Sequence, residues 1–339
     1  MDLYIRTYFD EEIRNFWEKQ EKIQNLNLFQ SYIWNSKVLE HFYDDRKNQI
    51  QIFVFKEKNE VIAILPFYKK KQLGFNILSL IGEGFTDYNS ILLRKDIMNE
   101  EKKINELIYK LKSYKNDFDI IYFKNQLNNI DLYPINPFFK FFNFKKDKKN
   151  YGIKIFGLWK DYIKENNLIK FEKQINYGLR KLEIDIKKNF LIITDNFKKK
   201  EIILQTLKNK KKFSSLYTFE KLKNFFLDNE ILKRVHCSGI YNKTNELLAS
   251  NIGILEKNKF IYYYPSYTLA KDKNKYSPGS ILLYCLINFS FNNGIKFFDF
   301  GVGNENYKKR WSNIIFNTYE YIYTHNLKGK IFKIIKNFY

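Results

Sequence analysis

The sequence predicts an α/β protein built from two units. At 339 residues the chain exceeds what one hydrophobic core usually organises. Apolar residues make up 45% and aromatic residues 19%, which is enough for two packed cores. Helix and strand patterns alternate in both halves, and they weaken between Asn125 and Asn150, where prolines and a lysine-rich run suggest a boundary. We therefore expect one unit over residues 1–149 and another over residues 150–339.

The sequence pattern of the first half of the chain predicts helices, then a β-hairpin, and then a mixed α/β arrangement. Apolar spacing indicates a helix, and short apolar runs between turn residues indicate strands. The expected elements are a helix over Glu11–Gln24, strands over Ile50–Lys56, Glu60–Tyr68, Phe75–Ile81 and Tyr88–Leu93, a helix over 99–114 and a strand over Asp119–Phe123.

The sequence pattern of the second half of the chain predicts helices and three consecutive strands, followed by a helix, a strand, a helix and a strand. Strands in series favour antiparallel pairing, so we expect mixed, mostly antiparallel sheets. The expected elements are strand Gly152–Phe156, amphipathic segment Trp159–Lys188, strand Phe190–Thr194, helices over 198–211 and 218–228, strands Arg234–Tyr241, Leu247–Glu256 and Lys259–Tyr267, helix Ile281–Asn292, strand Lys296–Phe300, helix Asn304–Trp311 and strand Ile314–His325.

The formal net charge of +22 raises the question of a polyanionic partner. Lysines occur in every predicted element and are interleaved with Asn, Ile, Phe and Tyr. This distribution favours a generally basic, solvated surface over a dedicated nucleic-acid site. Such a surface would help to capture an anionic cofactor, and it leaves peripheral membrane contact open.

Cysteine, histidine and hydropathy patterns exclude several classes. Cys237 and Cys285 stand apart, with no CxxC pair and no cluster with the three histidines, so we expect neither a disulfide framework nor a metal site. The early acidic residues do not resemble a secretory signal, and there is no uncharged apolar run of about 18 residues. A cytoplasmic protein is expected.

A candidate anion site precedes the helix Ile281–Asn292. The segment from Tyr276 through Ser277, Gly279 and Ser280 leads into the helix, whose first N–H groups and dipole attract negative charge. Glycine permits a close backbone approach. The alternative is that Ser-Pro-Gly-Ser only caps the helix.

A second group of candidates follows the strand Lys296–Phe300. Asp299 at the end of this strand could orient an acceptor or hold a cation, or it could serve only as a cap or ion-pair partner. Lys308, on the next helix, could stabilise a developing oxyanion, although a solvated lysine is an equally ordinary reading. Tyr307 and Trp311 are four residues apart and share one helix face.

These segments together resemble a known family. The run SPGSILLYCLINFSFNNGIKFFDFGVGNENYKKRW is similar to the signature of the CelD-like branch of the GNAT acyltransferases, with valine at position 302 where a basic residue is common. Upstream, FQSYIWNSKVLEHF, the region from VIAILPFYKK to TDYNSILL, and INYGLRKLEIDIKK resemble further family elements. In the last of these, Arg180 is the one family arginine present. The resemblance covers nearly the whole chain.

The resemblance implies two tandem GNAT-like folds, with the second binding an acyl-CoA, most simply acetyl-CoA, near Tyr276–Ser280. It implies Lys308, Asp299 and Tyr307 as the catalytic residues. It implies an acceptor side in the first unit at Asp87 and Tyr88. Further substrate contacts are expected from Arg180, Arg310 and Trp311.

The expected activity is acyl transfer from CoA to an amine or hydroxyl of a sugar, sugar nucleotide or polysaccharide precursor. The related Fem peptidyltransferases share the tandem fold and a similar aspartate and aromatic–lysine pair. An aminoacyl-tRNA-dependent transfer to a peptidoglycan precursor is therefore the rival reading. A non-catalytic, basic polyanion-binding protein is a third reading.

Overall fold

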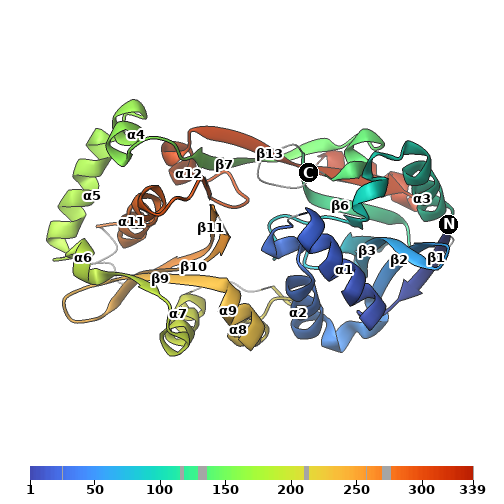
Figure 1. Cartoon of the computed structure of the whole chain (residues 1–339), viewed down its shortest axis with the longest axis horizontal. Helices are drawn as coiled ribbons and strands as arrows, with labels where there is room; N and C mark the ends of the chain where they lie inside the picture. Colours follow the sequence, from blue (N-terminus) through green and yellow to red (C-terminus); the bar gives the residue numbers. More distant parts are fainter. Residues whose placement is uncertain are drawn as a thin grey trace. The chain divides into compact units, whose positions relative to one another are not determined.

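The chain forms two compact units in the computed structural model (Figure 1). The structure describes residues 1–338 except 25, 115–117, 129–135, 210–213, 257 and 269–275. Unit 1 comprises Met1–Lys148 and Asn317–Tyr339, and unit 2 comprises Lys149–Phe316. The C-terminal segment differs from the sequence-based division, which placed it in the second unit. Strand β13, Ile314–Thr324, carries the chain into unit 1, where it pairs with strand β6, Ile120–Leu127.

Unit 1 contains a mixed sheet in the order β1-β2-β3-β4-β6-β13, with the short β5 paired to β3. Only β4 and β6 are parallel among these described strand pairs. Its helices and remaining strands are β1 Asp2–Arg6, α1 Glu11–Gln24, α2 Tyr32–Tyr43, β2 Ile50–Glu57, β3 Glu60–Gln72, β4 Phe75–Leu80, β5 Leu92–Leu93, α3 Glu101–Ser113 and α13 Leu327–Phe338, and its short 3-10 turns are Leu28–Gln30, Asp44–Gln49, Lys95–Asn99 and Pro137–Lys140.

Unit 2 contains a sheet in the order β7-β12-β11-β10-β9-β8, in which β11 and β12 are parallel. Figure 1 shows α11 on one face of β9, β10 and β11, and α7 on the other. Its elements are β7 Lys145–Lys154, α4 Trp159–Glu165, α5 Ile169–Lys181, α6 Ile186–Asn189, β8 Phe190–Ile193, α7 Asn196–Lys208, α8 Phe219–Leu227, α9 Asn229–Arg234, β9 Val235–Tyr241, β10 Leu247–Glu256, β11 Lys259–Tyr267, α11 Pro278–Asn292, β12 Phe297–Asp299 and α12 Asn306–Trp311.

These sheets confirm the predicted α/β class with mixed, mostly antiparallel strands. The predicted single amphipathic segment Trp159–Lys188 is instead three helices, because Asn167 and Glu183 adopt left-handed φ values of 57° and 53° that interrupt the helix. The predicted strand over Tyr88–Leu93 shortens to Leu92–Leu93.

Helix α11 is the main helix on its face of unit 2. Ile281, Leu282, Leu286 and Ile287 are fully buried in one hydrophobic cluster with β11 and β12 residues. Such side chains each contribute about 1.5–3 kcal/mol when they leave water. Gly294, at a φ of 70°, follows the helix and leads into β12. This packing fixes where the helix begins relative to the open end of the strands.

Candidate active site

Strands β11 and β12 separate at the centre of unit 2. They pair in parallel at three positions, from Lys259 opposite Phe297 to Ile261 opposite Asp299. Strand β12 ends there, whereas β11 continues to Tyr267. The two strands therefore diverge beyond Ile261 and leave the edge of β11 open on that side.

A β-bulge lies where the strands diverge. Strand β10 pairs Ile252 with Tyr264 and Ile254 with Ile261, so the single residue Gly253 faces two residues, Tyr262 and Tyr263. A bulge leaves one residue outside the regular ladder and re-aims its backbone. A backbone N–H re-aimed in this way could polarise a carbonyl oxygen.

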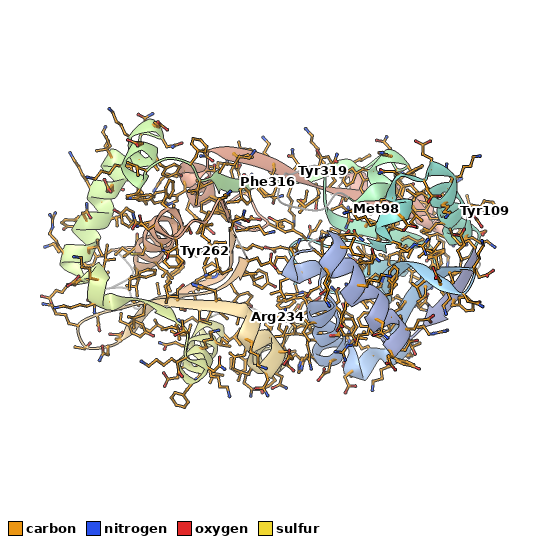
Figure 2. All side chains as sticks on the ribbon, viewed as in Figure 1. Met98, Tyr109, Arg234, Tyr262, Phe316 and Tyr319 are labelled. Carbon is orange, nitrogen blue, oxygen red and sulfur yellow. The ribbon has the colours of Figure 1, made fainter. Side chains whose placement is uncertain are left out.

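A pocket of about 300 Å³ occupies the same place. This volume is at the lower end of the range of small-molecule sites. Tyr262 belongs to the core cluster that includes α11, and Figure 2 shows it on β11. The pocket is lined by Tyr262, Pro265, Tyr267, Ser277, Gly279, Ser280, Leu283 and Tyr307. It carries no charged side chain, so charge on a ligand must be met by backbone groups or by solvent.

The start of helix α11 forms one wall of the pocket. Ser277, at a left-handed φ of 54°, precedes Pro278 at the first helical turn, and no acidic residue lies in that turn. A β-carbon on Gly279 would lie 3.3 Å from the Tyr267 ring, so glycine allows that ring to pack closely against the start of the helix. An exposed helix start without acidic residues is suited to an anion such as a phosphate.

Three of the four predicted cofactor-binding residues meet in this pocket, namely Ser277, Gly279 and Ser280. Tyr276 is not one of the lining residues. Its ring lies 6.2 Å from that of Tyr177 on α5, and its carbonyl lies close to Gly178. Asn274 and Lys275, which precede Tyr276 in the sequence, lie outside the described residues.

The loop after β12 is fastened at several points. Asp299 is fully buried, and its Oδ1 accepts a hydrogen bond from Gly301 N at 2.7 Å. Tyr151 donates to Asn304 at 2.6 Å. Asp299 therefore caps the turn, in line with the alternative that the sequence left open.

Lys308 also stabilises the loop that follows β12. Its Nζ lies 2.9 Å from a carboxylate oxygen of Glu305 and donates to Val302 O at 3.0 Å. A further contact to Gly301 O measures 3.5 Å. The side chain is 4% exposed and is not one of the pocket-lining residues. In this arrangement the ammonium holds the turn in place.

Tyr307 lines the pocket, unlike Asp299 and Lys308. Its helix α12 begins immediately after the fastened loop. The phenol is a hydrogen-bond donor that can supply a proton to a leaving group. Among the three predicted catalytic residues, it is the one placed to touch a ligand in the pocket.

The predicted substrate-binding residues of unit 2 are not among those that line this pocket. Arg180 is exposed on α5, and the Arg310 guanidinium stacks 4.4 Å from the Phe171 ring. Trp311 is 1% exposed and belongs to the core cluster of unit 2. In unit 1, Tyr88 is fully buried, whereas Asp87 is partly exposed. A buried Tyr88 offers no ring face to a sugar in this conformation.

Sequence reasoning missed Tyr262, Pro265, Tyr267 and Leu283 as lining residues. The available signal was the proline within an otherwise strand-like run, YYYPSY, because proline in a sheet occupies edges and bulges. Burial raises the pKa of Tyr262 well above its usual value. This phenol therefore stays protonated at neutral pH.

A comparison with known protein families finds a match within unit 2. Residues 234–309 match the family described as Acetyltransferase (GNAT) domain. The match spans β9, β10, β11, α11, β12 and the start of α12, which include every residue that lines the pocket. The prediction of a GNAT acetyltransferase domain in the second half of the chain is confirmed for these residues.

Solved structures share the fold over nearly the whole chain. L-PGS from Bacillus licheniformis is similar with a TM-score of 0.54 and 12% identity, covering 97% of each chain. FemX is similar with a TM-score of 0.53 and 10% identity, covering 99% of this chain and 100% of that one. The C-terminal domain of a lysylphosphatidylglycerol synthetase from Agrobacterium fabrum gives 0.53 and 9%, covering 95% of each. At such identities the likeness concerns the fold alone.

One curated protein matches in sequence, the DNA-directed RNA polymerase subunit beta' of Oedogonium cardiacum. It is 27% identical over 226 residues, which is 62% of this chain. The chain spans only 11% of the length of that subunit, and the activity of the polymerase is not carried over. Within the described residues, no helix is long and apolar enough to cross a membrane.

Proposed function

We propose that the chain transfers an acyl group from coenzyme A to an amine or hydroxyl of a sugar, sugar nucleotide or polysaccharide precursor, as in the CelD-like branch of the GNAT acyltransferases. The observation that carries the donor is the pocket between diverging β11 and the start of α11. Acetyl-CoA is the simplest donor for a pocket of about 300 Å³.

The pocket supports a definite orientation of the donor. The pyrophosphate binds at the start of α11 beside Gly279, where N–H groups and the helix dipole favour negative charge. The thioester lies near the bulge at Tyr262 and Tyr263, where the change in register re-aims a backbone N–H that can polarise the carbonyl.

Transfer proceeds directly. The acceptor nitrogen or oxygen attacks the thioester carbonyl carbon, the carbon–sulfur bond breaks, and the CoA thiolate leaves. Tyr307 donates its proton to the thiolate and is reprotonated by the proton that the acceptor loses. Lys308 and Asp299 hold the loop that presents Tyr307. The buried thiols support no covalent intermediate, since burial raises the pKa of both Cys237 and Cys285 to about 12.

A thiol-release assay tests this proposal. The purified protein is mixed with acetyl-CoA and a panel of amino sugars and sugar nucleotides. The release of free CoA is measured, and the masses of the products are determined by mass spectrometry. We expect release of CoA that depends on one class of acceptor. Failure of CoA to bind or to raise the melting temperature would refute the proposed donor.

Aminoacyl transfer from tRNA is the second candidate, and the net charge of +22 is the observation that favours it. The same acceptors are therefore offered with charged tRNA in place of acetyl-CoA. Transfer of an amino acid without CoA turnover would favour this candidate. Stabilisation by RNA with no transfer of either kind would instead favour a binding protein.

A further inference from the structure

Three buried polar side chains lie together in unit 2 without hydrogen-bond partners in the described part of the chain. Asn251 and Ser238 are fully buried, and His236 is 9% exposed. Both amide atoms of Asn251, the Ser238 hydroxyl and both ring nitrogens of His236 lack a partner there. Each buried polar group left unpaired costs about 1–3 kcal/mol. This cost suggests that the groups await a ligand; we call these residues the inner polar cluster.

The strand register places the inner polar cluster beside the bulge of β11. Ser238 on β9 faces Asn251 on β10, and His236 faces Gly253. Gly253 is the residue that faces the bulge. The Asn251 amide nitrogen lies 2.7 Å from the position that a β-carbon at Gly253 would take. Asn251 therefore leans into space that exists because residue 253 has no side chain.

The cluster lies on the same face of the sheet as the pocket. Asn251 pairs directly with Pro265, and directly opposed residues in an antiparallel pair point to the same face. Pro265 lines the pocket. None of the three residues lines the pocket itself. The inner polar cluster lies behind Pro265 and beside Gly253, which faces the bulge where the thioester is placed.

The cluster is electrically neutral. Burial, and to a smaller extent the nearby Lys199, lower the pKa of His236 to about 4, so the ring is uncharged at neutral pH. Lys199 itself donates to Leu232 O at 3.1 Å and to Val235 O at 3.0 Å. An amide, a hydroxyl and a neutral imidazole offer both donors and acceptors but no counter-charge. They suit a hydroxyl or amide group better than a carboxylate or ammonium.

We propose that the inner polar cluster recognises a neutral hydrogen-bonding group on the donor acyl chain, so that a 3-hydroxyacyl thioester is preferred over its unsubstituted counterpart. This inference rests on the proposed CoA donor and sharpens it. A pocket that offers hydrogen bonds discriminates against an analogue that cannot make them, because its own polar groups are then left unpaired.

Isothermal titration with CoA, butyryl-CoA and 3-hydroxybutyryl-CoA tests the inference without knowledge of the acceptor. We expect the hydroxylated thioester to bind the native chain about tenfold more tightly than butyryl-CoA, as one good hydrogen bond would give. In Asn251→Leu this ratio should fall to about one. Ser238→Ala removes a single hydroxyl and should reduce the ratio in part. This variant provides the test if Asn251→Leu does not fold.

Ser250→Ala is the matched control. Ser250 is a neighbouring buried serine on the same strand, it bonds Thr206 at 2.7 Å, and its side chain points to the opposite face. This variant should keep the native ratio. Equal binding of the two thioesters by the native chain, or an unchanged ratio in Asn251→Leu and Ser238→Ala, would show that the cluster holds only internal water. Absence of binding by CoA itself would instead refute the proposed donor.

Discussion

The two units contain the same pair of diverging parallel strands with different chemistry at the opening. In unit 1, β4 and β6 pair at three positions, ending with Ser79 opposite Tyr122. In unit 2, β11 and β12 do the same, ending with Ile261 opposite Asp299. Both units also place a helix between the two strands, α3 in unit 1 and α11 in unit 2. The shared arrangement is a property of the fold and does not by itself make a donor site.

The residues beyond the strand pairs make the difference. In unit 1, Glu83 follows β4 and is held by Lys70 at 2.6 Å, and Glu101 opens α3 after Glu100. Carboxylates at a helix start repel phosphate. In unit 2, the corresponding helix opens with Pro278, Gly279 and Ser280, and the pocket is lined by neutral groups. The comparison teaches that an anionic donor suits only one of two similar openings.

Tyr307→Phe should have the largest effect. Loss of the phenolic proton should lower turnover about a hundredfold or more, as expected for a general acid, with CoA affinity unchanged. Turnover and CoA binding are measured in parallel. Tyr276→Phe, a tyrosine outside the pocket, is the control and should behave like the native chain. Normal turnover in Tyr307→Phe would show that Tyr307 is not the general acid.

Ser280→Glu tests the difference between the helix starts directly. It gives α11 an acidic first turn like that of α3, so CoA affinity should fall about ten- to a hundredfold, and the loss should shrink at high salt. Ser280→Ala should change affinity little. The reciprocal Glu101→Ser in unit 1 should leave CoA binding unchanged. A gain of a second CoA site in that variant would break the comparison.

Lys308→Met should affect stability as well as turnover. The substitution leaves the Val302 carbonyl and the Glu305 carboxylate without their donor, which should lower the free energy of unfolding by about 2 kcal/mol. Lys309→Met, at the exposed neighbouring lysine, is the control for thermal and denaturant melts. Lost turnover with native stability would return Lys308 to a direct catalytic role.

Glu83→Gln should have the smallest effect, and it should depend on pH. Burial alone would raise the pKa of Glu83, but Lys70 and further hydrogen bonding hold it below its usual value. A lowered pKa in the folded state stabilises the fold above the unfolded pKa, and that stability is lost as pH falls through the folded pKa.

We therefore expect Glu83→Gln to lower the melting temperature at pH 7 by an amount equivalent to about 1 kcal/mol. The gap from the native chain should begin to close once the pH falls below the ordinary pKa of a glutamate, about 4.3, and should vanish as the pH passes the lowered pKa of the folded state. Melting curves across pH measure it. A gap that persists in acid would mean that the ion pair with Lys70 is not its source.

Local sequence was sufficient to predict much of the fold and part of the candidate site. The class of the fold, most element positions and the residues Ser277, Gly279, Ser280 and Tyr307 follow from periodicity, helix-start chemistry and motif resemblance, all of which depend on neighbours along the chain. The same local information left the role of Asp299 open, and the structure shows it capping the turn through Gly301. Arg310 and Trp311, expected to bind substrate, instead pack on other residues of unit 2, Arg310 on the Phe171 ring and Trp311 in the core cluster.

The remaining features depend on pairing between distant segments. The bulge at Tyr262 exists only in the register between β10 and β11. The same register places Asn251 opposite Pro265 of the pocket. The return of β13 to unit 1 likewise depends on pairing with a distant strand, as in Thr324 opposite Ile120. By itself the sequence determined which residues could form a donor site. The tertiary structure decided which of them meet, because register and packing, unlike periodicity, join residues far apart in the chain.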